Sequence, residues 1–268
     1  DDTKRGVLDT YDHVIVDEGQ DLSASHWLML RRLVATGPND LFICEDSHQR
    51  IYGERLVLSH FGIDVRGRSR KLTLNYRTTR QNLTFALRVL GGDRIVDLDG
   101  SEESRTGYRS RLSGVEPTLH GATSATEEEQ FVADTVNRWL TEPENTRPTA
   151  ESIGVLVRTN RVRDELARSL RQAGVPAETL SGESDETGRG VRVATMHRAK
   201  GMEFARVIVA GASASSVPFR WLLDNAPQED HSDVTQRERL LLYVACTRAR
   251  DQLIVSWNGT PSPFLPVT

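Results

Sequence analysis

Two adjacent carboxylates, Asp17 and Glu18, directly follow the apolar residues 14–16 near the start of the chain. Such an apolar run is typical of a buried strand, so the pair is expected at the point where the strand ends. One carboxylate there can hold a magnesium ion and the other can polarise a water molecule, which is the chemistry that hydrolyses a nucleoside triphosphate. Taken alone, the pair is weak evidence for such a site, since many strands end in an acidic turn exposed to solvent.

A phosphate-binding loop, rich in glycine and ending in Gly-Lys-Ser/Thr, normally precedes such a carboxylate pair. Only thirteen residues precede the predicted strand, and Lys4, Lys71 and Lys200 follow threonine, arginine and alanine instead of glycine. The sequence therefore contains no such loop. We expect the chain to be the C-terminal part of a longer protein that carries the loop upstream.

Composition places the chain among ordinary globular proteins. Its 268 residues, 37% of them hydrophobic, can form one large domain or two small ones. No apolar run reaches the roughly 18 residues of a membrane span, and no signal peptide opens the chain, so we expect a cytoplasmic protein without membrane contact. The net charge of −4 gives no overall basic field, so any nucleic-acid contact must come from local groups of arginines. Cys44 and Cys246 lie in apolar segments and are expected to be buried, reduced thiols.

Strand-like apolar runs alternate with segments of helical periodicity, which predicts an α/β fold with a parallel sheet flanked by helices. The predicted strands cover residues 14–16, 41–44, 153–157, 177–180, 191–194, 207–210 and 253–255. The predicted helices cover residues 23–36, 126–140, 160–173 and 236–249, with another that begins at Thr78 or Thr79 and ends at Gly91. A capping box of Thr126 and Glu129 is expected to open the second of these helices. The polar residues 93–116 have no periodicity and are expected to form a surface excursion.

Four further motifs follow the carboxylate pair in order. They are Glu-Asp-Ser-His-Gln-Arg-Ile-Tyr at 45–52, Leu-Asn-Tyr-Arg at 74–77, Thr-Met-His-Arg-Ala-Lys-Gly-Met-Glu-Phe at 195–204 and Leu-Tyr-Val-Ala-Cys-Thr-Arg-Ala at 242–249. With this ordered set, residues 14–255 resemble the UvrD/Rep/PcrA family of superfamily 1 DNA helicases. The resemblance implies two RecA-like domains that clamp ATP and walk along single-stranded DNA. Residues 1–75 would then be the end of the first domain, and residues 76–268 the complete second domain.

The resemblance also implies roles for residues that would contact ATP and Mg²⁺. Asp17 would hold magnesium, Glu18 would polarise the attacking water, and Gln49 would sense the γ-phosphate through its neutral amide. Tyr76 would stack on adenine, and Glu203 would accept a hydrogen bond from a ribose hydroxyl. Each has an ordinary alternative: Gln49 as a loop residue, Tyr76 as part of the core, and Glu203 as a surface acid.

Two arginines match the family's arginine fingers, which face the γ-phosphate from across the domain cleft. They are Arg77 and Arg248, whose guanidinium groups would offset the negative charge of the transition state. In a chain with 34 lysines and arginines, either could instead be a solvated or salt-bridged side chain.

Four further residues match positions that the family uses to bind DNA. Thr195 and His197 would touch the DNA backbone, and Tyr52 and Arg55 would supply a stacking face and a cation for a single strand. His197 could instead make a structural hydrogen bond.

The chain departs from the family pattern at two places. Glu45 and Glu54 stand where the family commonly has glycine and an aromatic residue, and their charge predicts weaker base stacking near Tyr52. Relatives also insert a large accessory domain where this chain has only the short polar linker 181–190, so we expect that domain to be absent.

These observations favour the C-terminal portion of an ATP-dependent DNA helicase or translocase that acts in DNA repair or replication. It would use ATP and Mg²⁺, bind single-stranded DNA, pair with the upstream RecA-like domain of the same protein, and be inactive alone. A truncated module that only binds nucleic acid or a partner is the alternative. The presence of Asp17, Glu18, Arg77 and Arg248 argues against it, because these residues have no evident use without a nucleotide. The motor could also be one part of a larger repair or defence enzyme.

Overall fold

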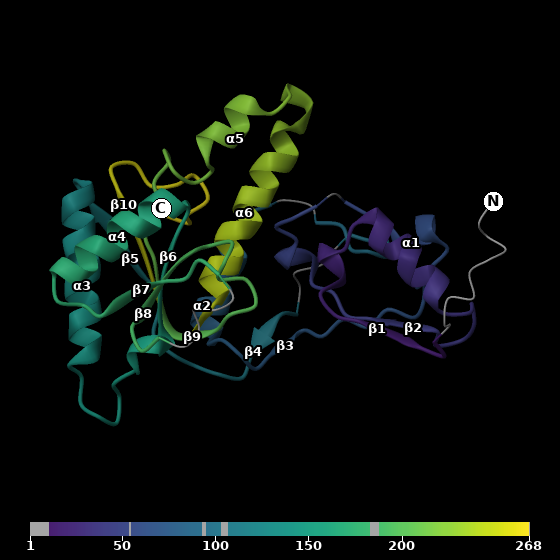
Figure 1. Cartoon of the computed structure of the whole chain (residues 1–268), viewed down its shortest axis with the longest axis horizontal. Helices are drawn as coiled ribbons and strands as arrows, with labels where there is room; N and C mark the ends of the chain where they lie inside the picture. Colours follow the sequence, from purple (N-terminus) through teal and green to yellow (C-terminus); the bar gives the residue numbers. More distant parts are fainter. Residues whose placement is uncertain (1–10, 54, 93–94, 103–106, 183–187, 268) are drawn as a thin grey trace. The chain divides into compact units, whose positions relative to one another are not determined.

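The computed structural model describes residues 11–53, 55–92, 95–102, 107–182 and 188–267. These residues fall into two compact units, which are described separately (Figure 1). The first unit lies within residues 1–72 and 93–106, and the second within residues 73–92 and 107–268. Residues 183–187 of the predicted linker lie outside the described part of the chain.

The first unit is built around two short parallel strands, β1 (Val14–Val16) and β2 (Leu41–Ile43). Helix α1 (Ala24–Leu33) joins them and begins where the Ser23 hydroxyl accepts a hydrogen bond from the His26 backbone N–H. Its described residues also form three short 3₁₀ turns: η2 (Gly19–Asp21), η3 (Ser47–Gln49) and η4 (Leu58–Phe61). Its small core consists of Val16, Trp27, Leu58, Ile63 and Leu98.

Leu98 shows that the prediction of a surface excursion for residues 93–116 was wrong for its first half. Its side chain is buried in the core of the first unit, and its carbonyl accepts a hydrogen bond from the Leu58 N–H at 2.9 Å. Ile95 is buried as well. These apolar residues are too few and too irregularly spaced to produce a periodic pattern, so only the tertiary contacts reveal their role.

The described residues of the second unit contain a six-stranded parallel sheet, which confirms the predicted α/β class. Its strand order is β5-β10-β9-β6-β8-β7. The strands are β5 (Thr118–Ala122), β6 (Ile153–Val157), β7 (Ala177–Thr179), β8 (Val191–Thr195), β9 (Phe204–Val209) and β10 (Ala249–Asn258). A separate two-stranded ladder joins β3 (Leu74–Asn75) and β4 (Arg109–Ser110).

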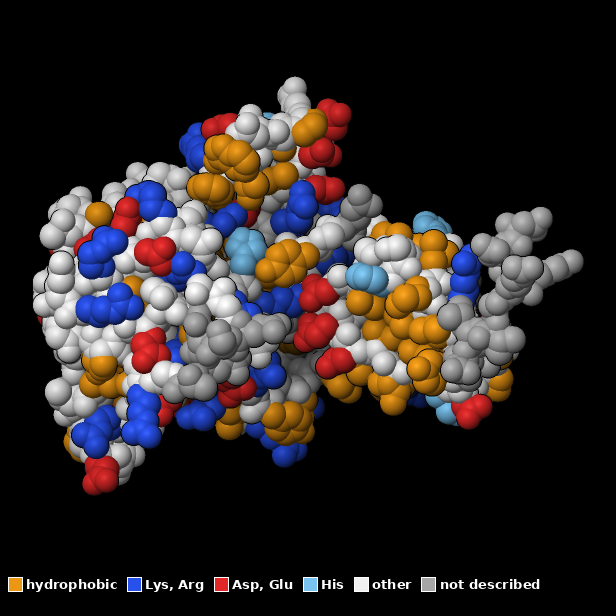
Figure 2. Space-filling model, viewed as in Figure 1, with side chains coloured by type: hydrophobic (Ala, Val, Ile, Leu, Met, Phe, Trp, Pro, Cys, Tyr) orange, Lys and Arg blue, Asp and Glu red, His pale blue; other side chains and the backbone are white. Residues whose placement is uncertain are grey.

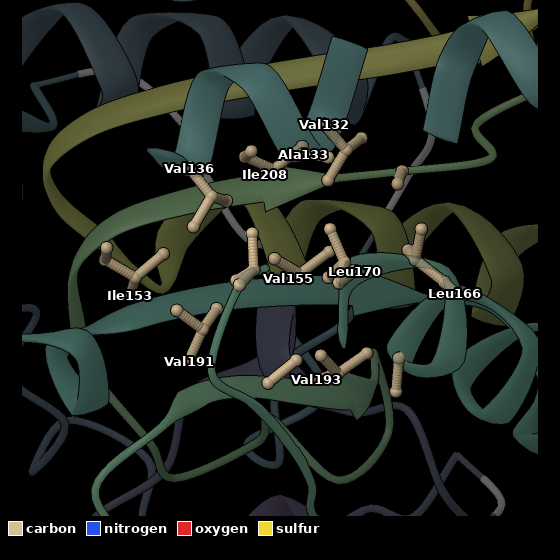
Figure 3. Close-up of a cluster of buried hydrophobic side chains, with 14 of the residues drawn as sticks. Val132, Ala133, Val136, Ile153, Val155, Leu166, Leu170, Val191, Val193 and Ile208 are labelled. Carbon is tan, nitrogen blue, oxygen red and sulfur yellow. The ribbon is translucent and has the colours of Figure 1, made fainter. Parts of the chain in front are cut away.

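Helices cover both faces of this sheet (Figure 1). One face packs against α3 (Ala125–Leu140) and α4 (Asn160–Gln172), and Figure 3 shows Val136 and Leu170 of these helices in one buried cluster with Val155 of β6. The other face packs against α2 (Arg80–Val89) and α6 (His231–Thr247), which is preceded by the short helix α5 (Arg220–Asn225). Successive strand residues point to opposite faces, so the continuous apolar strands serve both helix layers.

Helix α3 begins at a different capping residue from the predicted one. The predicted capping box of Thr126 and Glu129 was wrong, because α3 begins two residues earlier with the Ser124 hydroxyl accepting from the Glu127 N–H at 3.2 Å. Glu127 in turn accepts hydrogen bonds from the backbone and hydroxyl of Thr123. Two overlapping Ser/Thr-x-x-Glu patterns occur here, so the local signal alone could not choose between them.

The two cysteines have different environments. Cys246 is fully buried, as predicted, and burial raises the pKa of its thiol to about 12. The prediction was wrong for Cys44, which is exposed because it follows the last residue of the short strand β2. Among the described residues, no helix combines the length and the apolar character that a membrane span needs.

Candidate functional site

The carboxylate pair of the first unit lies at the carboxyl end of β1, where both side chains are exposed. The Asp17 carboxylate accepts a hydrogen bond from the Glu18 N–H at 2.9 Å. Glu18 has a left-handed backbone, with φ 51° and ψ 41°, a conformation that costs a residue with a side chain of the order of 1 kcal/mol. Non-glycine residues held in this conformation are concentrated at functional sites.

Gln20 connects this pair to the next motif, and sequence reasoning did not identify it. Its buried side chain donates to the Glu18 carboxylate and accepts a hydrogen bond from the Asp46 N–H at 2.9 Å. Gln20 therefore holds Glu18 in place relative to the turn after β2. Its position two residues after a carboxylate pair was the available signal, but a polar residue in a turn is too common to be distinctive.

Gln49 lies in the η3 turn, and its side-chain amide donates to the Asp46 carboxylate at 2.7 Å. Burial raises the pKa of Asp46, but hydrogen bonds from His48 and Gln49 outweigh it, so the net pKa is lowered. Asp46 is therefore ionised at neutral pH and fixes the orientation of the Gln49 amide. Tyr52 and Arg55 are the two residues of this unit that are predicted to bind single-stranded DNA. Tyr52 is 46% exposed and Arg55 is also exposed, whereas the neighbouring Glu54 lies outside the described residues.

The second unit brings three predicted nucleotide-contacting residues to the amino-terminal edge of its sheet. Glu203 directly precedes β9, and Arg248 directly precedes β10. The Arg77 guanidinium forms an ion pair with the Glu203 carboxylate, with 3.0 Å between Nε and Oε2. The Phe204 N–H donates to the Arg248 carbonyl at 3.0 Å, which places the two motifs side by side.

The two candidate arginine fingers differ strongly in exposure. The Arg77 side chain is 51% exposed, while Arg248 is 1% exposed. The Arg248 guanidinium donates to the carbonyls of Val244 and Met202 and to the Thr247 hydroxyl. A cation at this position also interacts favourably with the C-terminal end of the α6 dipole. In this structure Arg248 therefore stabilises the junction of α6 and β10, and Arg77 is the more accessible cation.

Tyr76 precedes Arg77 and is 65% exposed. The Arg111 guanidinium lies 5.9 Å from the centroid of its ring, within the range of a weak cation–π contact. The alternative of a core tyrosine is therefore wrong.

The two predicted DNA-contacting residues of this unit lie at the opposite, carboxyl edge of the sheet. Thr195 ends β8, and its hydroxyl accepts a hydrogen bond from the Arg198 N–H at 3.2 Å. His197 follows in the same turn and is half-buried. The structure therefore separates these two residues from Arg77, Glu203 and Arg248 by the length of the strands.

A buried ion pair lies beside His197 and was not predicted. Arg158 follows β6 and makes a bidentate contact with Glu238 of α6, with distances of 2.8 and 2.6 Å. The two side chains are only 9% and 3% exposed. They are 80 residues apart in the sequence, so no local pattern could have revealed the pair.

The protonation of His197 follows from its surroundings. Burial lowers the pKa of His197 below its usual 6.5, the nearby Arg158 charge lowers it further, and Glu238 opposes the effect. We therefore expect an uncharged imidazole at neutral pH and an NMR titration midpoint below 6.5. The unfolding free energy should decrease as the pH falls through 6.5 towards the folded-state pKa, because the unfolded chain takes up the proton first. The His197→Gln variant should lose this part of the pH dependence, and a midpoint above 6.5 would contradict the expectation.

The described residues contain no group of three or more His, Cys, Asp or Glu side chains able to hold a metal ion by themselves. Magnesium needs fewer protein ligands, since one or two carboxylates together with phosphate oxygens and waters complete its shell. The exposed Asp17 carboxylate fits this requirement.

Comparison with known proteins gives consistent matches. The model of the UvrD-like helicase C-terminal domain matches residues 70–185 and 177–260, and that of the UvrD/REP helicase N-terminal domain matches residues 2–58. A probable DNA helicase of Mycoplasma pneumoniae is 26% identical over 267 residues, covering 94% of this chain and 46% of the relative. The ATP-dependent DNA helicase UvrD2 of Mycobacterium tuberculosis is 36% identical over 107 residues, covering 38% of this chain and 15% of the relative.

A solved structure described as the C-terminal domain of a possible DNA helicase from Lactobacillus plantarum is 23% identical, with a TM-score of 0.49. The match covers 72% of this chain and 92% of that one. The chain thus spans less than half the length of the curated relatives it matches here.

Proposed function

Because the chain belongs to the UvrD-like helicase family, we propose that it is the C-terminal part of an ATP-dependent DNA helicase or translocase that moves on single-stranded DNA. The observation that carries the proposal is that the predicted nucleotide-contacting and DNA-contacting residues lie at opposite edges of the second unit's sheet. Arg77 and Glu203 pair at the amino edge, whereas Thr195 and His197 lie at the carboxyl edge. A motor needs such a division, because the nucleotide and the DNA must bind at separate places on one rigid sheet.

The amino edge of the second sheet would serve the nucleotide. Arg77 presents a half-exposed guanidinium that can offset charge on a γ-phosphate, and Arg248 supports the junction from within. Glu203 would accept a ribose hydroxyl, and Tyr76 would stack on adenine. The Arg77–Glu203 pair lies at the surface, where such pairs stabilise by at most about 1 kcal/mol, so a nucleotide can readily replace it.

The first unit would contribute the carboxylates. Asp17 would hold Mg²⁺, which neutralises phosphate charge when bound, and Glu18 would polarise the attacking water. Gln20 would position Glu18, and the neutral side-chain amide of Gln49 would sense whether a γ-phosphate is bound.

We further propose that the phosphate-binding loop lies in an upstream RecA-like domain of the same polypeptide. None of the 268 residues forms a Gly-Lys-Ser/Thr sequence, so the chain alone lacks the backbone cradle and lysine that bind ATP phosphates. The strands of the first unit also expose apolar side chains, with Ile15 79% and Phe42 63% exposed, which a neighbouring part of that domain would cover. A role in DNA repair or replication in the cytoplasm completes the proposal.

The test compares ATP hydrolysis by the complete native polypeptide with hydrolysis by the 268-residue chain. We expect hydrolysis by the complete polypeptide to be stimulated by single-stranded DNA, and the shorter chain to be inactive with the same DNA and Mg²⁺. The chain mixed with DNA in the absence of ATP serves as the control for folding and binding. Hydrolysis by the shorter chain, or no stimulation of the complete polypeptide, would contradict the proposal and favour a module that only binds.

A further inference from the structure

An exposed aromatic residue in the second unit belongs to none of the helicase motifs. Trp221 of α5 is 61% exposed, whereas Trp27 and Trp139 are buried and Trp257 is half-buried. An exposed side chain of this size is an informative observation in a folded unit, because its burial would stabilise the fold. Figure 2 shows apolar side chains gathered on the surface of the region that α5 occupies in Figure 1.

The segment that carries Trp221 is firmly held at its start by Phe219. The centroids of the two aromatic rings are 6.5 Å apart, with a tilt of 34°. The Phe219 N–H donates to the Glu238 carboxylate at 2.8 Å, and the Arg158 guanidinium lies 4.9 Å from the centroid of the Phe219 ring. The buried ion pair therefore anchors Phe219, which in turn supports the exposed indole. A stacking surface that is already ordered loses little conformational entropy on binding.

The same ion pair places these aromatic residues at the DNA-contacting edge of the sheet. Arg158 follows Val157 of β6, which pairs directly with Thr195 of β8. His197 is close enough for the charges of Arg158 and Glu238 to act on it. Trp221 is thus linked through Phe219 and the ion pair to the turn that holds the predicted backbone contacts.

The charges around α5 favour one direction of approach for a polyanion. Arg220 is exposed and makes no ion pair with any residue that the structure describes. Beyond it, towards the start of α6, follow the acidic residues Asp224, Glu229, Asp230 and Asp233. A nucleic-acid backbone would be attracted at the Arg220 end of α5 and repelled at the acidic end, so a strand would pass Trp221 on the side of Arg220.

We propose that Trp221 is a base-stacking contact for single-stranded DNA at the carboxyl edge of the second sheet. The inference rests on the proposed function and extends it by one named residue. Thr195 and His197 would contact the backbone, and the indole would stack on a nearby base. Since every base has a π-face, such a contact holds the strand without sequence preference.

The test measures binding of a fluorescein-labelled oligothymidylate to the complete native polypeptide by anisotropy, without nucleotide. Trp221→Ala should weaken binding about five-fold or more, which is the range for loss of one base–aromatic stack, while Trp221→Phe should retain most of the affinity. The matched control is Val115→Ala, which truncates a side chain that is 56% exposed and precedes β5, on the amino side of the same sheet. This control should bind like the wild type.

Two outcomes would contradict the stacking contact alone, and a third would contradict the proposed function as well. Unchanged affinity of Trp221→Ala, with normal binding by the wild type, would overturn the stacking contact and leave the proposed function intact. An equal loss in Val115→Ala would also overturn it, because the effect would not be specific to the indole. If the wild-type polypeptide failed to bind the oligonucleotide, both the contact and the proposed function would be wrong.

Discussion

Replacing Arg77 by alanine in the complete native polypeptide should lower kcat for DNA-stimulated ATP hydrolysis about 10³-fold or more. A guanidinium that contacts the γ-phosphate acts mainly on the transition state, where negative charge shifts between the phosphate oxygens. The fold should be unaffected, because the Arg77 side chain is 51% exposed and its ion pair with Glu203 lies at the surface. Arg77→Lys should recover only part of the rate, since an ammonium group cannot form the planar fork.

Arg250 offers a matched control on the same edge of the sheet. Its side chain is 50% exposed and also pairs with a carboxylate, with 2.8 Å between its Nη2 and Oδ2 of Asp251. Arg250→Ala removes the same charge a short distance away, so it should leave kcat nearly unchanged. Equal losses of kcat in the two variants would mean that any positive charge at this edge of the sheet has the same electrostatic effect. Arg77 would then not be an arginine finger.

Replacing Glu238 by alanine should lower the unfolding free energy of the chain by about 3–5 kcal/mol. The change leaves Arg158 buried without its carboxylate, and a buried charge without a counterion is far more costly than the pair itself was favourable. It also removes the acceptor of the Phe219 N–H. Urea denaturation followed by circular dichroism measures the effect.

Two further variants show whether the buried charge is the cause. Glu165→Ala breaks an exposed pair with Arg161 within helix α4 and should change the unfolding free energy by less than about 0.5 kcal/mol. The double variant Arg158→Met with Glu238→Leu should recover most of the lost stability, because no isolated charge remains. If the double variant were less stable than Glu238→Ala, packing around the site and not the unpaired arginine would explain the loss.

The fold class of the second unit and the order of the motifs could be predicted from the sequence alone. Continuous apolar runs such as residues 153–157 and helical periodicity are local signals, and each depends only on residues a few positions apart. The placement of Thr195 at a strand end was predictable for the same reason. The prediction that Asp17 and Glu18 follow a strand also agrees with the structure, whereas their roles with ATP and Mg²⁺ stay predictions.

Only the tertiary structure decided which distant groups meet. Leu98 joins the core of the first unit, Gln20 connects two motifs, Arg77 pairs with Glu203, and Arg158 pairs with Glu238. None of these contacts produces a periodic pattern in the sequence. A single polar or apolar residue has the same neighbours in the sequence whether its side chain is solvated or buried. The partner depends on strand order and helix placement, and these are set by the packing of the whole unit.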